Sequence, residues 1–302
     1  MPNTDDLYAR AADDTTHFDL LRTLCDMYGI APPGQASSAR TITDVWQGPE
    51  FTSDNTALGA TATAFVYELS IAGDPAARFA TASALPPGLL LNGSLIAGVP
   101  TTPGTYRMDV AVTAATGTLT RSIVIVITRD TDGDGFSDEI ETALATDPSN
   151  AASVPVEAPT GPPSALTISG LSARLNFRHV RGDSLTVTGS LTLPGGFLAA
   201  GSAVVLNAGG VVRSYVLNRK GRPKRTRNEL FRLSSDGRFV WRLQRATLKA
   251  ALADEGLTNA RANGVRTGAL VTVILGGSAF ERVERVNWSA RADRSGTASG
   301  EK

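Results

Sequence analysis

The chain of 302 residues contains a single cysteine, Cys25, so no disulfide can form within it. This lack does not indicate a cytosolic protein, because exported bacterial proteins often have no disulfides. No apolar run approaches the roughly 20 residues of a membrane-spanning helix; the longest, Ile123–Ile127, predicts one buried strand. A signal peptide is also missing, since residues 1–10 are acidic and polar. We expect either an intracellular protein or an exported one truncated upstream, and the motifs below favour the second.

The net charge is zero, but the two signs are unevenly distributed. Residues 1–160 contain 20 acidic and 7 basic side chains, whereas residues 161–302 contain 9 acidic and 22 basic ones. Such halves could attract each other, or the basic half could bind a polyanion. The apolar content of 42%, with 30 glycines and 16 prolines, is typical of a folded chain of short strands and turns. Length and composition together predict a mainly β protein with two domains.

Residues 14–28 have the apolar spacing of a short helix, with Gly29 as its C-terminal stop. One helix cannot bury its own apolar face, so this helix would be marginal alone. The run Thr16–Ile30, THFDLLRTLCDMYGI, resembles the last helix of the secreted bacterial phosphoesterases, a family of acid phosphatases and phospholipases C. Members commonly have His-Tyr-Ser-Leu-Leu-Arg-Thr there. The resemblance extends over residues 14–47.

This resemblance places the family's nucleophile and metal ligands upstream of the matching stretch, in a region that this sequence does not contain. His17 is then the one candidate functional residue, and we interpret it as a helix-start histidine without a site. Cys25 has no nearby base and is interpreted as a core thiol. We therefore predict no phosphatase activity and no catalytic residue. The alternative is the C-terminal appendage of a secreted phosphoesterase whose catalytic domain is missing from this chain.

The stretch 49–128 has the pattern of a β-sandwich. Apolar residues alternate with polar ones over 65–72 and 106–113, as in half-buried strands. Three short motifs resemble the Ig-like, dystroglycan-type cadherin-like domains of bacterial surface proteins: Leu85–Leu89, Ile96–Pro100 and Gly104–Tyr106. The resemblance implies a stalk or adhesion module without catalysis.

The segment Asp130–Glu141, DTDGDGFSDEIE, is the most chemically specific stretch of the sequence. Carboxylates stand at positions 1, 3, 5, 9 and 12 of a twelve-residue loop, with glycine at position 6. Calcium takes six to eight oxygens, whereas magnesium needs a smaller and stricter octahedron, so the spacing favours Ca²⁺. The predicted ligands are carboxylate oxygens, the carbonyl of residue 136 and a direct or water-mediated contact at residue 138: Asp130, Asp132, Asp134, Phe136, Asp138 and Glu141.

A solvated acidic linker is the alternative for this loop, but such a linker would rarely place the glycine and the final glutamate in register. The loop follows a strand rather than a helix, so it is not a paired EF-hand. Together with Ile140, Leu144 and Thr146-Asp147-Pro148, it resembles the thrombospondin type 3 and dockerin-like repeats of exported proteins. Bound calcium would neutralise the clustered carboxylates and fix the angle between the flanking domains.

Beyond a Pro-rich stretch, expected to be a stiff spacer over 151–164, alternating strands predict a second β-sandwich with one short helix over 247–255. The basic cluster Arg219–Arg227 is either a solvated hairpin tip or a contact for a surface glycan or other polyanion. Its lack of aromatic residues argues against nucleic acid. Trp241 and Trp288 could form a sugar platform, but core packing is the expected role.

The sequence thus predicts a non-catalytic, extracellular or cell-surface modular protein with calcium-stiffened Ig-like domains and a display or adhesion role. The expected order is a phosphoesterase-like helical remnant, an Ig-like sandwich, a calcium loop with a short helix, a Pro-rich linker, a C-terminal sandwich and a disordered tail. These parts are assigned to residues 1–47, 48–129, 130–150, 151–164, 165–295 and 296–302.

Overall fold

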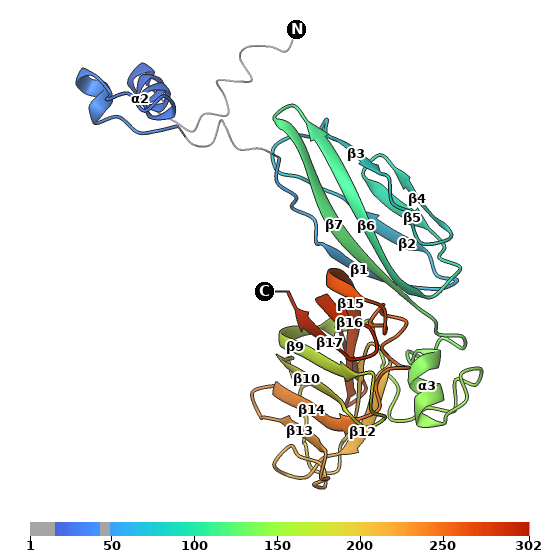
Figure 1. The fold of residues 1–302 in the computed structure, drawn as a ribbon. Helices are drawn as coiled ribbons and strands as arrows, with labels where there is room; N and C mark the ends of the chain where they lie inside the picture. The colour runs from blue at the N-terminus through green and yellow to red at the C-terminus, as the bar shows by residue number, and fades with distance from the viewer. Residues whose placement is uncertain (1–15, 43–48, 302) are drawn as a thin grey trace.

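The computed structural model describes residues 16–42 and 49–301. Figure 1 shows two β domains in contact, with helix α3 beside their junction and helix α2 near the N-terminus. The beginning of the expected N-terminal helix, before residue 16, and the leader segment 1–10 lie outside the described residues. Within the described part of the chain, no helix is long and apolar enough to cross a membrane.

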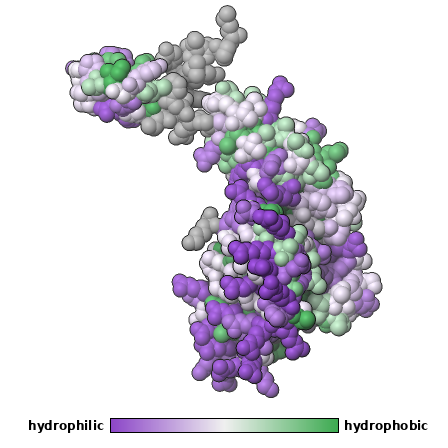
Figure 2. Space-filling model, viewed as in Figure 1, coloured by the Kyte–Doolittle hydropathy of each residue, from purple (hydrophilic) through white to green (hydrophobic). Residues whose placement is uncertain are grey.

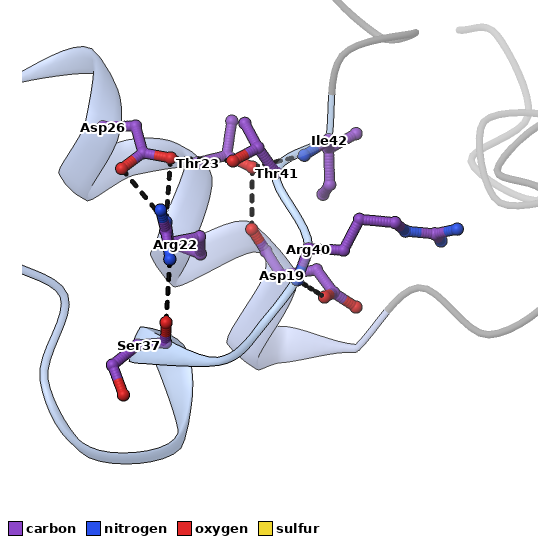
Figure 3. A network of polar contacts seen from close by, with 8 residues as sticks. All are labelled: Asp19, Arg22, Thr23, Asp26, Ser37, Arg40, Thr41 and Ile42. Atoms are coloured by element: carbon purple, nitrogen blue, oxygen red, sulfur yellow. Dashed lines mark hydrogen bonds and ion pairs between the residues drawn. The ribbon is translucent and has the colours of Figure 1, made fainter.

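The N-terminal segment consists of helix α2 (His17–Met27) and the 3-10 turn η1 (Gly34–Ser37). Thr16 and Asp19 form a capping box that satisfies backbone N–H groups at the start of α2. The returning chain is held by the helix, because Asp19 Oδ1 accepts from Arg40 N at 2.8 Å and Thr23 Oγ1 accepts from Ile42 N at 2.7 Å (Figure 3). Polar contacts therefore fold this segment into a small unit.

The apolar face of α2 is only partly covered. Cys25 is buried, but several large apolar side chains are exposed: Leu20, Leu21, Leu24, Met27, Tyr28 and Ile30. The expectation that a single helix cannot bury its own apolar face agrees with this exposure.

The first β domain is a sandwich of two sheets. One sheet has the order β1-β7-β6-β3 and the other β2-β5-β4. Apolar residues of both sheets form one core between them, including Phe65, Ile96 and Val110. The strands of the two sheets, in that order, are Thr56–Ala60, Gly117–Thr128, Gly104–Ala114, Arg78–Thr81, Phe65–Glu68, Leu95–Gly98 and Leu89–Asn92.

Strand β7 is buried on both faces. Ile123, Ile125 and Ile127 point into the sandwich core. Val124 and Val126, on the other face, pack with residues of the second domain, Leu270 and Val283. The continuous apolar run predicted a buried strand, and the structure explains why it does not alternate: each face of the strand meets a different core.

The second β domain is built on one ten-stranded sheet around a large apolar core. Its order is β12-β11-β15-β16-β17-β9-β10-β14-β13, with β8 (Ser164–Ala165) paired to β16. The strands in that order are Val211–Val216, Ala203–Ala208, Ala262–Leu275, Ser278–Arg291, Ser295–Gly300, Thr167–Asn176, Asp183–Ser190, Arg238–Ala246 and Glu229–Leu233. The mainly β fold with a short N-terminal helix is as predicted.

Side chains join the two ends of this sheet. Tyr215 of β12 stacks on Phe231 of β13, with ring centroids 5.8 Å apart and planes 5° from parallel. Arg213 Nε lies 2.9 Å from Glu229 Oε1, and the Tyr215 hydroxyl donates to Glu229 Oε2 at 3.0 Å. The first and last strands are thus held together without backbone pairing.

Two local expectations in this region are wrong, the helix over 247–255 and the disordered tail, and the expected spacer over 151–164 packs against the second domain. The helix expected over 247–255 is absent there: residues 249–256 form consecutive turns, and Leu248 N donates to buried Asp183 at 2.9 Å, which ties the segment to β10. The segment 151–164 is not a free spacer: Val154 and Val156 pack on the second domain, and Thr160 N donates to Gly277 O at 3.0 Å. Because proline has no backbone N–H, this segment can form few hydrogen bonds within itself. It lies along the surface of the second domain instead.

The expected disordered tail, 296–302, is mostly strand β17, paired with β16 on one side and β9 on the other. Small residues have weak intrinsic strand propensity. At position 296 glycine is needed because Trp288 covers it: a Cβ on Gly296 would lie 2.0 Å from Trp288 Cη2. Close packing under a large ring therefore overrides local propensity.

Candidate metal centre

The acidic loop connects the end of β7 to helix α3 (Asp138–Leu144). Ser137 caps the helix, since its hydroxyl accepts from Ile140 N at 3.4 Å. Asp138 N donates to Arg129 O at 2.9 Å, so the two ends of the loop are brought together. Gly133 and Gly135 adopt φ values of +75° and +93°, a conformation that residues with a Cβ rarely take.

Backbone hydrogen bonds orient the first three aspartates. Asp130 accepts from Gly133 N at 2.8 Å through Oδ1 and from Gly135 N at 3.1 Å through Oδ2. Asp132 Oδ1 accepts from Asp134 N at 3.3 Å, and Asp134 Oδ1 accepts from Phe136 N at 2.8 Å. These turns bring one oxygen of each carboxylate within 4.8 Å of the others.

Three carboxylate oxygens of the loop lack hydrogen-bond donors. Among the described residues, Asp132 Oδ2, Asp134 Oδ2 and Glu141 Oε2 are buried and accept no hydrogen bond. A buried carboxylate oxygen without a partner is costly in free energy. A divalent cation with hard-oxygen preference would satisfy such oxygens, so the donor set of Asp130, Asp132 and Asp134 fits calcium. Glu141 does not belong to the group of oxygens that lie within 4.8 Å of one another, and its predicted metal contact stays a prediction.

Glu141 is fully buried at the first turn of α3. Burial, and with it the charges of Asp134, Asp132, Asp138 and Asp130, together raise the pKa of its carboxyl to about 7. Four negative side chains therefore act on one glutamate. Burial and the charges of Asp132 and Asp130 also raise the pKa of Asp134. The crowding expected from the spacing of the sequence is present in three dimensions.

Asp138 is oriented differently from the other acids. Its Oδ1 accepts from Thr131 N at 2.8 Å and its Oδ2 from Thr131 Oγ1 at 2.7 Å. Arg129 Nε lies 4.0 Å from the same Oδ2. Asp138 thus ties the start of the loop to the helix, and its predicted metal contact, direct or through water, stays a prediction.

Phe136 has a role that sequence reasoning missed. Its side chain is fully buried in a cluster formed by Ile140 and residues of the second domain, among them Val205, Val212 and Ile274. The loop is therefore anchored to the second domain through position 7, whose carbonyl was the predicted ligand. An isolated aromatic residue between acids was the signal that could have indicated this anchor.

A pocket of about 550 Å³ lies beside the loop, where both β domains and α3 meet. Two pairs of adjacent carboxylates, from two separate segments, line it: Asp138 with Glu139, and Asp254 with Glu255. Thr105 of β6 donates a hydrogen bond to Glu255 across the domain boundary. No sequence pattern could have placed these segments together.

Other candidates from the sequence fall outside the loop. Trp241 and Trp288 are each 1% exposed in the core of the second domain, so a sugar platform is excluded and core packing is confirmed. His17 is exposed at the start of α2, with its ring 3.9 Å from that of Phe18. The basic cluster 219–227 lies between β12 and β13, at the end of the second domain away from the first (Figure 1).

The family comparisons match two adjacent parts of the chain. Residues 47–129 match the family described as "Putative Ig domain", and residues 130–151 match the family described as "Bacterial TSP3 repeat". TSP3 repeats are generally calcium-binding, in agreement with the cluster of Asp130, Asp132 and Asp134. The resemblance of residues 14–47 to phosphoesterases is not shown by these matches. No curated protein matches the chain.

Solved structures resemble the chain only in part. A putative alpha-galactosidase from Bacteroides fragilis is 26% identical, with a TM-score of 0.26 over 29% of this chain and 19% of its own. The titin M3 domain is 16% identical, with a TM-score of 0.21 over 26% of this chain and 95% of its own. A SusE-like surface located polysaccharide binding protein from Bacteroides thetaiotaomicron is 12% identical, with a TM-score of 0.23 over 78% and 33%.

The chain spans about a fifth of the length of the alpha-galactosidases that it matches. The two family matches, by contrast, are contiguous and occur in the order that the motifs predicted. Residues 47–129 are an Ig-like domain and residues 130–151 a bacterial TSP3 repeat, both of them non-catalytic kinds of domain.

Proposed function

We propose that the chain is a non-catalytic extracellular module in which a calcium ion in the acidic loop stabilises the junction of the two β domains. The ion would be held by oxygens of Asp130, Asp132, Asp134 and Glu141 and by the Phe136 carbonyl. The observation that carries the proposal is the set of three buried carboxylate oxygens without donors, at Asp132, Asp134 and Glu141.

The position of the loop supports a structural role for the ion. The loop begins two residues after β7 of the first domain, and its Phe136 side chain is buried in the second domain. Without a cation the carboxylates repel one another, which opposes the loop conformation that holds both ends. Neutralising them would therefore stiffen the connection between the domains, as a display or adhesion protein requires.

The expected affinity fits an extracellular setting. Calcium sites of extracellular modules have dissociation constants of roughly 10⁻⁴ to 10⁻³ M. At a free calcium concentration ten times the Kd, binding to the folded state stabilises it by about 1.4 kcal/mol. A gain of that size raises Tm by a few degrees for a domain of this length, on the order of 2–4 °C per kcal/mol.

The test is calorimetric titration of calcium into metal-stripped protein, combined with thermal unfolding. We expect one site per chain and a rise in Tm for the wild type. Glu141→Gln should weaken binding by about tenfold or more, because a charged ligand is lost. Glu157→Gln, an exposed acid in the segment that follows, is the matched control and should bind as the wild type does.

If calcium produced no heat of binding and no shift in Tm, the proposed calcium-binding role of the loop would be wrong. Equal weakening by Glu141→Gln and Glu157→Gln would point to diffuse attraction of calcium by the acidic surface. Limited proteolysis near Gly135 provides a second measurement, since a chelator should expose this loop to cleavage if calcium orders it.

A further inference from the structure

A second pocket, of about 610 Å³, lies between the loop 218–228 and strands β13 and β14. Its lining is strongly cationic. Six basic side chains surround it: Arg222, Lys224, Arg225, Arg227, Arg232 and Arg242. Only four of the six belong to the basic run of the sequence; Arg232 and Arg242 are brought to it by the sheet.

The positive charge of this pocket is not compensated within the described residues. None of the six cations makes an ion pair there, and their side-chain nitrogens make no hydrogen bond. The one carboxylate of the lining, Glu229, is engaged by Arg213 at 2.9 Å and by the Tyr215 hydroxyl at 3.0 Å. Like charges gathered around one hollow raise its affinity for anions.

The loop is fastened to the sheet rather than extended into solvent. Gly221 is buried, its N–H donates to Asn218 O at 2.9 Å, and its carbonyl accepts from Leu233 N at 2.8 Å. With φ +64°, a Cβ at this position would lie 1.8 Å from Leu233 O. The cations of the loop are thus held over β13, which reduces the entropy lost on binding a ligand.

Strand alternation points Arg232 and Arg242 outward. Phe231 and Trp241, their neighbours in the strands, are buried in the core, whereas both arginines are exposed. The two arginines can therefore be replaced without touching the core. In the orientation of Figure 1, hydrophilic side chains cover the end of the second domain where these strands lie (Figure 2).

We propose that this pocket binds an acidic polysaccharide, one that carries carboxylate or sulfate groups. Guanidinium groups match these planar or multi-oxygen anions through paired hydrogen bonds. Asn228, Thr226 and Gln244, which also line the pocket, offer neutral partners for sugar hydroxyls. The aromatic ring of the lining, Phe231, is buried, so no platform for stacking bases exists and single-stranded nucleic acid is disfavoured.

The site is independent of the calcium loop. It lies at the end of the second domain away from the first (Figure 1), and its lining contains no residue of Asp130–Glu141. The acidic N-terminal half therefore does not occupy it in the described part of the chain. Both a soluble anionic chain and a surface-bound one could reach it.

The test measures binding of polygalacturonate and heparin to the full chain, with uncharged dextran as the neutral control. We expect both anionic chains to bind, dextran not to bind, and the affinity to fall as salt is raised. The double variant Arg232→Gln/Arg242→Gln should weaken binding by about tenfold or more, because two charge-assisted contacts are lost. The matched control Arg174→Gln/Arg261→Gln removes two exposed arginines of the same domain that do not line the pocket.

Two further measurements keep the outcomes distinct. Binding that persists unchanged in EGTA separates this site from the proposed calcium function. Gly221→Ala, which displaces the loop while keeping all six charges, should also weaken binding. Equal affinity of the Arg232→Gln/Arg242→Gln and Arg174→Gln/Arg261→Gln variants would overturn the proposal, as would tighter binding of a single-stranded oligonucleotide than of polygalacturonate.

Discussion

Thr105 of the first β domain donates a hydrogen bond to Glu255 of the second, 150 residues further along the chain. Glu255 is 9% exposed, and the pKa of its carboxyl is raised to about 7. Burial is the largest cause, the charges of Glu139 and Asp254 act in the same direction, and the hydrogen bond from Thr105 acts against them. Thr267 Oγ1 donates to the backbone oxygen of the same residue at 2.7 Å. The contact between the domains is thus linked to the protonation of one buried acid.

Glu255 is expected to make the protein less stable as pH rises. Its folded pKa of about 7 exceeds the ordinary value of 4.5, so the folded state binds the proton more tightly than the unfolded state. The free energy of unfolding should therefore decrease between pH 4.5 and 7 and level off above. Glu255→Gln, neutral throughout, should be more stable than the wild type at pH 8, by about 3 kcal/mol, and equal to it near pH 4.

Urea unfolding of both proteins at pH 4 and pH 8 measures this difference. Other acids titrate in both proteins, so the comparison isolates residue 255. Asp254→Asn, at an exposed neighbour, is the control and should show a smaller difference. An equal gain from Glu255→Gln at both pH values would contradict the prediction.

Two adjacent residues of β7 should give different phenotypes. Ile125 lies in the sandwich core and Val124 in the contact with the second domain, where its Cγ1 would be 2.5 Å from a Cβ added to Gly268. Ile125→Ala should destabilise the first domain by about 2–5 kcal/mol. Val124→Glu should separate the domains while leaving the sandwich folded, because only the outer face gains a charge. Small-angle scattering measures whether the domains separate, and calorimetry measures the unfolding transitions of each variant. Identical behaviour of both variants would show that the two faces of β7 are not independent.

Phe136→Ala should affect both the loop and the second domain. Truncating a fully buried phenylalanine costs about 3–5 kcal/mol. The loop should lose its anchor, so calcium affinity should decrease although no carboxylate is changed. Phe136→Leu, which keeps most of the buried volume, should retain the affinity. Thermal unfolding and calcium titration of the two variants measure this, and unchanged affinity in Phe136→Ala would separate the anchor from the metal site.

Gly296→Ala should destabilise the second domain. The added methyl group would overlap the Trp288 ring, with the Cβ 2.0 Å from Cη2. Overpacking of this kind typically costs about 1–3 kcal/mol. Thr297→Ala, at the exposed neighbouring position of β17, should change the free energy of unfolding by much less. Near-ultraviolet circular dichroism of the tryptophan and chemical unfolding report both effects. If the Gly296→Ala variant had the spectrum and the stability of the wild type, the result would argue against β17 as a central strand.

The acidic loop was predictable because its geometry is local. Asp130, Asp132 and Asp134 are oriented by backbone N–H groups two to five residues away. The Ig-like domain was predictable for a similar reason, since turn motifs and a two-residue period repeat within about eighty residues. The turns at 249–256 were missed because residues 247–249 donate hydrogen bonds to β10 and to the turn before it, and these bonds override a helical pattern.

The sequence by itself determined the β architecture, the order of the Ig-like and TSP3 parts and the carboxylates of the loop. These depend on spacing and on hydrogen bonds between near neighbours. Only the tertiary structure decided that Val124 faces another domain, that Gly296 lies under Trp288, and that Arg232 joins the basic cluster. Such contacts depend on how distant strands pack, and no local pattern of the chain specifies the partner that a buried face will meet.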